Sequence, residues 1–276
     1  MSVVLGIDGG GTKTRASLVD GNKVLGYAEN GSIKRLRVGA EAAEKHLRAV
    51  LKDAFAQAGT VSVSAATVGV ASATMPGVPE WITKVLRDFG VERAEIVGDE
   101  VIALDAAFKG GPGILQIAGT GSNTVGRGPD GRRENAGGWS SRLGDEGSGY
   151  WIGVNAVRQA LRAYDREEPS RVLETVGRIW GTKSIDELVN VGDGTPGPDF
   201  AALAPAISGL AEEGDAVAAA VLAQAAKDLV EFVLLVREPF FAGLRAAAPE
   251  LPILETEVAG IEGAVWRAQR LAGERS

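Results

Sequence analysis

Two apolar runs separated by a polar, glycine-rich segment open the chain. Residues 3–7 are apolar throughout, and residues 15–19 alternate in the manner of a half-buried strand. Short runs of this kind predict two β-strands. A third strand-like run at residues 23–28 follows a polar turn at residues 20–22. We therefore expect an antiparallel meander of three strands at the N-terminus.

The next part of the chain alternates between helical and strand-like patterns. Apolar residues recur at helical spacing in residues 41–58, 79–89 and 100–108, and buried-type strands lie at residues 64–71 and 94–97. This alternation predicts α/β layers with a partly parallel sheet.

A Gly/Pro-rich segment at residues 109–113 marks the expected domain boundary. We expect an N-terminal domain over residues 1–112 and a second domain over residues 113–259. The second domain is expected to be mostly helical from residue 149 to about residue 236. A last helix, residues 260–276, is expected to pack on the N-terminal domain.

The glycine-rich segment itself suggests an anion site. Gly9, Gly10 and Gly11 precede Thr12 and Lys13 between the first two predicted strands. Successive backbone N–H groups in such a turn form a concavity that suits phosphate oxygens, and Thr12 and Lys13 add a hydroxyl and a positive charge. The spacing matches neither a Walker loop nor a Rossmann fingerprint. A hairpin turn without a ligand is the alternative interpretation.

A second glycine loop strengthens the phosphate interpretation. Gly119, Thr120 and Gly121 follow another apolar run and precede further hydroxyl and amide side chains. Two similar loops about a hundred residues apart indicate a duplicated half-fold with two phosphate-binding loops.

Composition and charge exclude several classes of function. Lys and Arg number 29 against 36 Asp and Glu, and the net charge of −7 argues against a nucleic-acid or anionic-membrane surface. There is no cysteine, which excludes disulfides, iron–sulfur clusters and thiolate chemistry, and the single histidine excludes a multi-histidine metal site. No run reaches the roughly 18 apolar residues of a membrane span, so we expect a cytoplasmic protein.

Carboxylates near the predicted strand ends are the candidates for chemistry. Asp99 follows a short apolar strand, where it could accept a proton from a substrate hydroxyl during phosphoryl transfer, or simply cap the following helix. Asp105, on that helix, is a weaker candidate for the proton acceptor. Asp8 ends the first strand and could hold Mg²⁺ through water, or bond its own backbone in the turn.

A polar loop in the second half adds a candidate sugar pocket. Asp145 and Glu146 lie between glycines and close to Trp139, and carboxylates beside an aromatic face suit sugar hydroxyls. Paired carboxylates also allow a glycosidase interpretation, although adjacent residues seldom face each other across a bond. A tight turn that caps the helix from residue 147 is the remaining alternative.

Taken together, these stretches resemble the N-acetylglucosamine kinase and BadF/BadG/BcrA/BcrD-type ATPase family of the actin, sugar kinase and Hsp70 superfamily. The resemblance runs in order from residues 7–14 through residues 98–99, 117–123 and 137–139 to residues 143–148. It implies an α/β fold of two ribonuclease-H-like (actin-like ATPase) lobes around a central nucleotide and sugar cleft. ATP and Mg²⁺ are the implied cofactors, and a small-molecule sugar is the implied substrate. A homodimer is the implied possible assembly.

The resemblance also implies roles for particular residues. Asp99 matches the catalytic aspartate, and the loops at Gly10–Lys13 and Gly119–Gly121 match the two phosphate loops. Matching substrate positions, in addition to Asp99, are Lys34, Ser72, Asn123, Trp139, Asp145 and Gly149.

Two departures from the family pattern affect the expected substrate and nucleotide. Lys34-Arg35 stands where N-acetylglucosamine kinases usually have Asn-His, so the substrate is expected to carry an anionic group or the specificity to be broader. The family's apolar strand and Gly-Gly adenosine loop are not found before Arg237. Either a segment is missing or adenosine is held differently.

The expected function is an ATP-dependent sugar kinase that phosphorylates the 6-hydroxyl of N-acetylglucosamine or a related amino hexose. A non-catalytic sugar or nucleotide sensor on the same fold, and an ATPase that drives a partner protein, are the alternatives.

Overall fold

A computed structural model describes residues 2–247 and 258–273 of the chain. The strands are β1 (Val3–Gly9), β2 (Lys13–Asp20), β3 (Lys23–Gly31), β4 (Val63–Val70), β5 (Ala94–Val97), β6 (Gly113–Ala118), β7 (Ser122–Arg127) and β8 (Arg133–Gly137). The helices are α1 (Arg35–Val38), α2 (Ala40–Ala58), α3 (Val78–Asp88), α4 (Asp99–Phe108), α5 (Gly149–Asp165), α6 (Val172–Trp180), α7 (Ile185–Gly192), the 3₁₀ helix η1 (Phe200–Leu203), α8 (Ala204–Glu212), α9 (Ala216–Ala247) and α10 (Gly260–Gly273). None of the helices within the described ranges is both long and apolar enough to cross a bilayer.

A five-stranded sheet forms the centre of the first compact unit. Its strand order is β3-β2-β1-β4-β5, with β1, β2 and β3 antiparallel and β4 and β5 joined in parallel. This confirms the predicted meander and the partly parallel sheet. Helix α4 follows β5 directly, so its first residue lies at the carboxyl end of a parallel strand.

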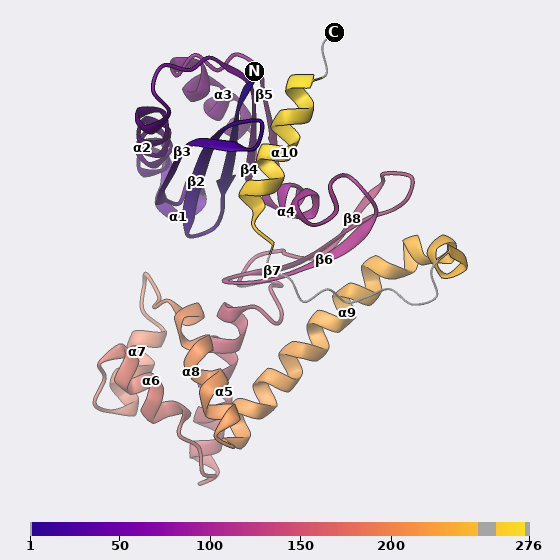
Figure 1. Cartoon of the computed structure of the whole chain (residues 1–276). Helices are drawn as coiled ribbons and strands as arrows, with labels where there is room; N and C mark the ends of the chain where they lie inside the picture. Colours follow the sequence, from indigo (N-terminus) through magenta and orange to yellow (C-terminus); the bar gives the residue numbers. More distant parts are fainter. Residues whose placement is uncertain (1, 248–257, 274–276) are drawn as a thin grey trace. The chain divides into compact units, whose positions relative to one another are not determined.

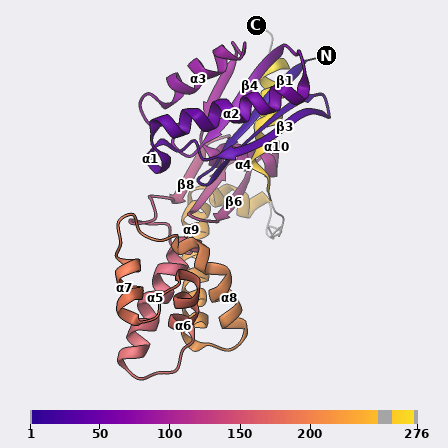
Figure 2. The same cartoon turned by 90° about the vertical axis from the view of Figure 1, so that its left-hand side faces the viewer.

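Helices cover both faces of this sheet (Figure 1). Successive side chains of β1 point to opposite faces of the sheet, so alternate residues pack against different helices. Leu5 and Ile7 are buried in the core to which α2 contributes Leu47 and Leu51. Val4, one position out of phase, packs with α10 instead. Figure 2 shows α2 in front of the sheet and α10 behind it.

The described residues separate into two compact units. The first contains residues up to Leu115, Val125–Arg133 and the described part of the C-terminal segment, and the second contains Gln116–Thr124 and Glu134–Ala247. Residues 125–133 therefore group with the first unit, unlike the expected single boundary after residue 112. Helix α10 lies against β1, β4 and α4 of the first unit.

The second unit is mainly helical. Its core is formed by apolar residues of α5, α6, α7, η1, α8 and α9, such as Val172, Leu203 and Ile207. Strands β6, β7 and β8 form a separate three-stranded sheet. Helix α9 continues without a break through Arg237, where the family resemblance implies an apolar strand and a glycine loop.

Candidate active site

The glycine loop joins β1 to β2 as a hairpin. Gly9 pairs with Thr14 and Asp8 pairs with Arg15, so the predicted strand, turn and strand are confirmed. A Cβ atom on Gly9 would lie 2.6 Å from Cδ1 of Ile33, whereas a Cβ on Gly11 would meet nothing within 4 Å. Packing therefore accounts for Gly9, while the tip of the loop is open space that a ligand could approach.

Asp8 and Asp99 lie close enough to influence each other's ionisation. Burial raises the pKa of Asp8, Arg15 opposes that shift, and the negative charge of Asp99 adds to it. Burial is also the main cause that raises the pKa of Asp99 to about 6, with the adjacent Glu100 carboxyl as the second. A half-buried carboxyl that titrates near neutral pH is suited to exchange protons with a substrate.

Asp99 is not the cap of α4. Gly98 occupies the N-cap position and makes no side-chain cap, Asp99 is the first helical residue, and the Asp99 carboxylate accepts a 3.2 Å hydrogen bond from the Glu100 backbone N–H. The capping interpretation of Asp99 is therefore wrong. Its side chain lies at the strand-to-helix junction and does not serve as the N-cap of the helix.

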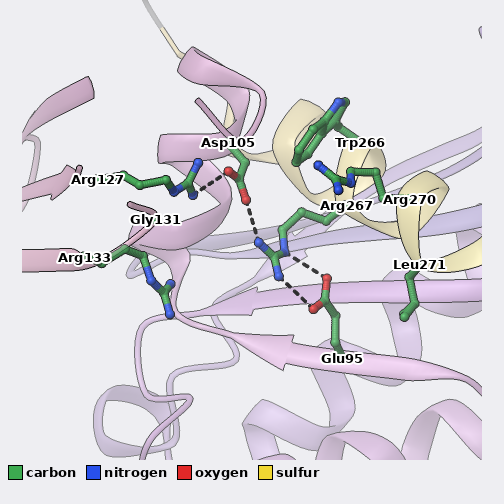
Figure 3. A pocket seen from close by; sticks show the side chains of 10 residues that line it. Glu95, Asp105, Arg127, Gly131, Arg133, Trp266, Arg267, Arg270 and Leu271 are labelled. Carbon is green, nitrogen blue, oxygen red and sulfur yellow. Dashed lines mark hydrogen bonds and ion pairs between the residues drawn. The ribbon is translucent and has the colours of Figure 1, made fainter. Parts of the chain in front are cut away.

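Asp105, the weaker rival, is fully buried in an ion-pair network. Its carboxylate lies 2.6 Å from Nη2 of Arg127 and accepts a 2.7 Å hydrogen bond from Nη1 of Arg267. Arg267 also forms bonds of 2.8 and 2.9 Å with both carboxylate oxygens of Glu95 (Figure 3). This arrangement gives Asp105 a structural role and removes it as a candidate proton acceptor.

A second polar network surrounds the glycine loop and was not predicted. Arg15 contacts Asp8 at 3.4 Å and Glu29 at 3.1 Å, and Lys13 contacts the same Glu29 at 3.2 Å. The Tyr27 hydroxyl also donates to Glu29, and these bonds, led by the one from Tyr27, lower the pKa of the Glu29 carboxyl to about 2. The hairpin register, which pairs Arg15 with both Asp8 and Glu29, is the sequence signal that could have revealed it.

Lys34 is linked to the glycine loop through Ser32. The Ser32 hydroxyl accepts the Lys34 backbone N–H at 3.1 Å and donates to the carbonyl of Gly10 at 3.2 Å. Within the described ranges, the Lys34 ammonium forms no ion pair. A cationic side chain is thus available next to the loop.

Ser72 lies just beyond the end of β4 and carries an unpaired hydroxyl. Its side chain is buried, yet its Oγ finds no hydrogen-bond partner among the described residues. Buried hydroxyls are normally paired, because leaving one unpaired costs about 1–3 kcal/mol. A hydroxyl-rich ligand would satisfy this group.

In the second unit, three of the predicted residues surround the second glycine loop. The Gly149 backbone N–H donates to the Gly119 carbonyl at 2.8 Å. A Cβ atom on Gly121 would lie 2.8 Å from Oδ2 of Asp145, so this glycine permits the carboxylate to approach the loop. Asn123 follows on β7, and its buried Oδ1 has no partner within the part of the chain that the structure describes.

Trp139 belongs to a polar loop of the same unit but is 77% exposed. Its backbone N–H donates to Gly144, which closes the loop, and the Ser140 N–H donates to Asp145 at 3.2 Å. Ser148, and not Asp145, caps α5 by accepting the Trp151 N–H at 3.1 Å. A tight turn does precede α5, because the Ser148 N–H donates to the Asp145 carbonyl at 3.1 Å, but the cap of the helix is Ser148 and the prediction that this turn caps the helix from residue 147 is wrong.

The donor set of the first unit fits a magnesium ion held largely by water and phosphate. Asp8 supplies carboxylate oxygens, and no group of three or more His, Cys, Asp or Glu forms a metal cage in the described residues. Mg²⁺ usually keeps several waters and binds through one or two carboxylates together with substrate phosphates. A single carboxylate beside the open glycine loop is consistent with that preference.

Comparisons with known proteins identify the family. The N-acetylmuramic acid/N-acetylglucosamine kinase of Clostridium acetobutylicum is 32% identical over 83% of this chain and 77% of its own length. The N-acetyl-D-glucosamine kinase of Dictyostelium discoideum is 29% identical over 84% of this chain and 78% of its own length. A solved structure from Chromobacterium violaceum, assigned as an N-acetylglucosamine kinase, has a TM-score of 0.68 at 30% identity and covers 99% of this chain and 93% of that one.

The fold is accordingly the two-lobed α/β fold of the actin-like sugar kinases. The model of the BadF/BadG/BcrA/BcrD ATPase family matches residues 5–242. The chain therefore belongs to the BadF/BadG/BcrA/BcrD ATPase family.

Proposed function

We propose that this protein is an ATP-dependent sugar kinase that transfers the γ-phosphoryl group of ATP to the 6-hydroxyl of N-acetylglucosamine or a related amino hexose. The observation that carries the proposal is the Asp99 carboxyl, whose pKa is raised to about 6 beside Asp8 and the glycine loop. The names of the curated relatives support this substrate class.

Asp99 acts as the general base. At neutral pH most of it is ionised, and it accepts the proton of the sugar hydroxyl as the new phosphorus–oxygen bond forms. The bond between the γ-phosphorus and the bridging oxygen breaks, and ADP leaves with the electron pair. Burial keeps the basicity of Asp99 well above that of an ordinary aspartate, which favours the proton transfer.

The two glycine loops hold phosphates. The first loop binds phosphate oxygens through backbone N–H groups, a hydroxyl and an ammonium, and consists of Gly10, Gly11, Thr12 and Lys13. The second loop consists of Gly119, Thr120 and Gly121. Asp8 would hold Mg²⁺ through water, and the ion supplies neutralisation of phosphate charge. Glu29 orients Lys13 and Arg15 near this loop.

Each unit contains groups that suit a sugar. In the first unit, Ser72 offers a buried hydroxyl without a partner in the described residues. In the second unit, Asn123 offers a buried polar atom without such a partner, and Asp145 offers a carboxylate beside the second loop. Trp139 offers an exposed indole, and Gly149 allows the loop to approach α5 closely.

The unpaired Lys34 ammonium favours a substrate that carries a carboxylate, such as N-acetylmuramic acid. A lysine–carboxylate bond contributes on the order of tenfold in affinity. We expect Lys34→Asn to lower kcat/KM for N-acetylmuramic acid by about tenfold and to leave kcat/KM for N-acetylglucosamine nearly unchanged. An equal effect on both sugars would contradict this role.

The first experiment measures Mg²⁺-dependent ATP consumption with N-acetylglucosamine, glucose, N-acetylmannosamine, glucosamine and N-acetylmuramic acid. Sugar-dependent turnover that Asp99→Asn abolishes supports a kinase. ATP hydrolysis without any sugar would favour an ATPase that acts on a partner protein. Sugar binding without turnover would favour a sensor. A homodimer in the cytoplasm stays a prediction.

A further inference from the structure

A cavity of about 420 Å³ lies in the first unit, away from the proposed active site. All residues that line it belong to that unit, and they come from β5, α4, the turn after α4, the β7–β8 hairpin and α10. Asp8, Asp99 and the glycine loop are not among them. Its volume falls within the range typical of small-molecule sites.

The lining of this cavity is positively charged, although the protein as a whole carries a net charge of −7. Four arginines, namely Arg127, Arg133, Arg267 and Arg270, face two carboxylates, Glu95 and Asp105. Figure 3 shows Arg127 and Arg133 on one side of the cavity and Arg267 and Arg270 on α10 at the other. Two positive charges are therefore left uncompensated.

The carboxylates neutralise only two of the four arginines. Glu95 accepts hydrogen bonds from Nε and Nη2 of Arg267, and Asp105 lies between Nη1 of Arg267 and the Arg127 side chain. These four groups form the closed network described above and have little capacity left for a ligand. Arg133 and Arg270 carry the remaining charge.

Arg133 and Arg270 have no carboxylate partner among the described residues. Arg270 is held instead by stacking over the ring of Trp266, with its Cζ 5.1 Å from the ring centroid. Trp266 is in turn confined by Gly110, where a Cβ atom would lie 2.9 Å from the indole. Arg270 is thus positioned in advance while its charge stays uncompensated.

We propose that this cavity is an anion-binding site for a small phosphate monoester. Such an ester carries a charge of about −1.5 to −2 at pH 7 and three acceptor oxygens, which matches two uncompensated guanidinium groups. Guanidinium groups bind phosphate through paired hydrogen bonds, and Trp266 and Leu271 provide an apolar wall for the organic part. The proposal does not depend on the kinase function, because the site shares no residue with the active site.

Calorimetric titration with ribose 5-phosphate, and with uncharged ribose as the control ligand, tests the site directly. We expect saturable binding of ribose 5-phosphate alone, weakened about tenfold in Arg133→Gln and in Arg270→Gln. The matched control is Arg158→Gln, which removes an exposed arginine on α5. Lys13→Gln reports any binding of the same ester at the glycine loop.

Binding that weakens in the Arg133 and Arg270 variants, and not in the Arg158 variant, supports the proposal. Binding that is lost only in Lys13→Gln would place the ester in the phosphate loop and overturn it. Equal binding of ribose, or no saturable binding of the ester at millimolar concentration, would overturn it as well. Circular dichroism checks that each variant is folded, and both arginines are exposed, so their replacement leaves the core unchanged.

Discussion

The Asp99 carboxyl is ionised at neutral pH at a position where burial opposes the charge. Its pKa is about 6 in the folded protein, against 3.8 for an unperturbed aspartate, so the folded state binds its proton more tightly than the unfolded state. The protonated group therefore stabilises the fold below pH 4, and that stability is lost as the pH rises through 6. At pH 7 the charge costs about 2–3 kcal/mol.

Asp99→Asn is accordingly expected to raise the free energy of unfolding by about 2–3 kcal/mol at pH 7 and by little near pH 4. Urea denaturation at several pH values measures this difference. Asp53→Asn, which changes an exposed aspartate on α2, is the matched control and should show no such trend. A destabilised Asp99→Asn protein at pH 7 would mean that the charge is favoured in the fold.

The same ionisation predicts the pH dependence of turnover. If Asp99 is the base, kcat/KM for the sugar rises with pH through about 6 and levels off above it. Asp99→Asn should lose turnover by a factor of order 10² or more while sugar binding persists. A steady-state pH profile and a sugar titration measure the two effects, and near-wild-type turnover would remove Asp99 from the mechanism.

At the scale of elements, α10 is fitted to the first unit through glycines. A Cβ atom on Gly263 would lie 1.8 Å from the Ile102 carbonyl oxygen of α4, and a Cβ on Gly6 of β1 would lie 2.7 Å from Val265. These contacts allow α10 to approach both α4 and the sheet. Because α4 begins at Asp99, the position of α10 also bears on the candidate base.

Gly263→Ala is therefore expected to destabilise the protein by about 1–3 kcal/mol, since an added methyl group must push two helices apart. Gly209→Ala on α8 is the control, because a Cβ there meets nothing within 4 Å and alanine favours helix by about 1 kcal/mol. Thermal unfolding of both variants provides the comparison. A Gly263→Ala protein that melts at the same temperature as the Gly209→Ala protein would show that α10 can move away from α4 at little cost in free energy.

The elements of the first unit were largely predictable because their signals are local. The β1–β2 hairpin, α2 and α4 follow from periodicity and turn residues within each segment. The Asp105–Arg267 bond was not predictable, since it joins residues 162 positions apart. The sequence also could not decide whether Gly98 or Asp99 caps α4, because the choice depends on backbone angles.

In the candidate site, too, residues with a local sequence signal were predicted and residues whose contacts depend on the fold were missed. Asp8, Asp99 and both glycine loops were predicted from strand ends and glycine spacing, whereas Arg15 and Glu29 were missed. Their contacts depend on the register of three paired strands. The family resemblance, and not periodicity, suggested Ser72 and Asn123, whose buried polar atoms lack partners in the described part of the chain.

At the scale of the whole molecule, each compact unit contains one of the two glycine loops that we propose to hold phosphate, but the sequence lacks the glycine pair that the family resemblance places at adenosine. Helix α9 continues through that region. Phosphate contacts do not distinguish ATP from GTP, because both nucleotides carry the same triphosphate. Discrimination between them needs hydrogen bonds to the base, each typically contributing about 1–3 kcal/mol.

We therefore expect this kinase to prefer ATP to GTP by less than about tenfold in kcat/KM, which corresponds to under about 1.4 kcal/mol. Initial rates with both nucleotides at saturating sugar measure the ratio, on protein whose intact mass matches the 276-residue sequence. Lys13→Gln should weaken both nucleotides equally, because it removes a phosphate contact. A preference for ATP above about a hundredfold would show that other residues read the adenine base and that the glycine pair is dispensable.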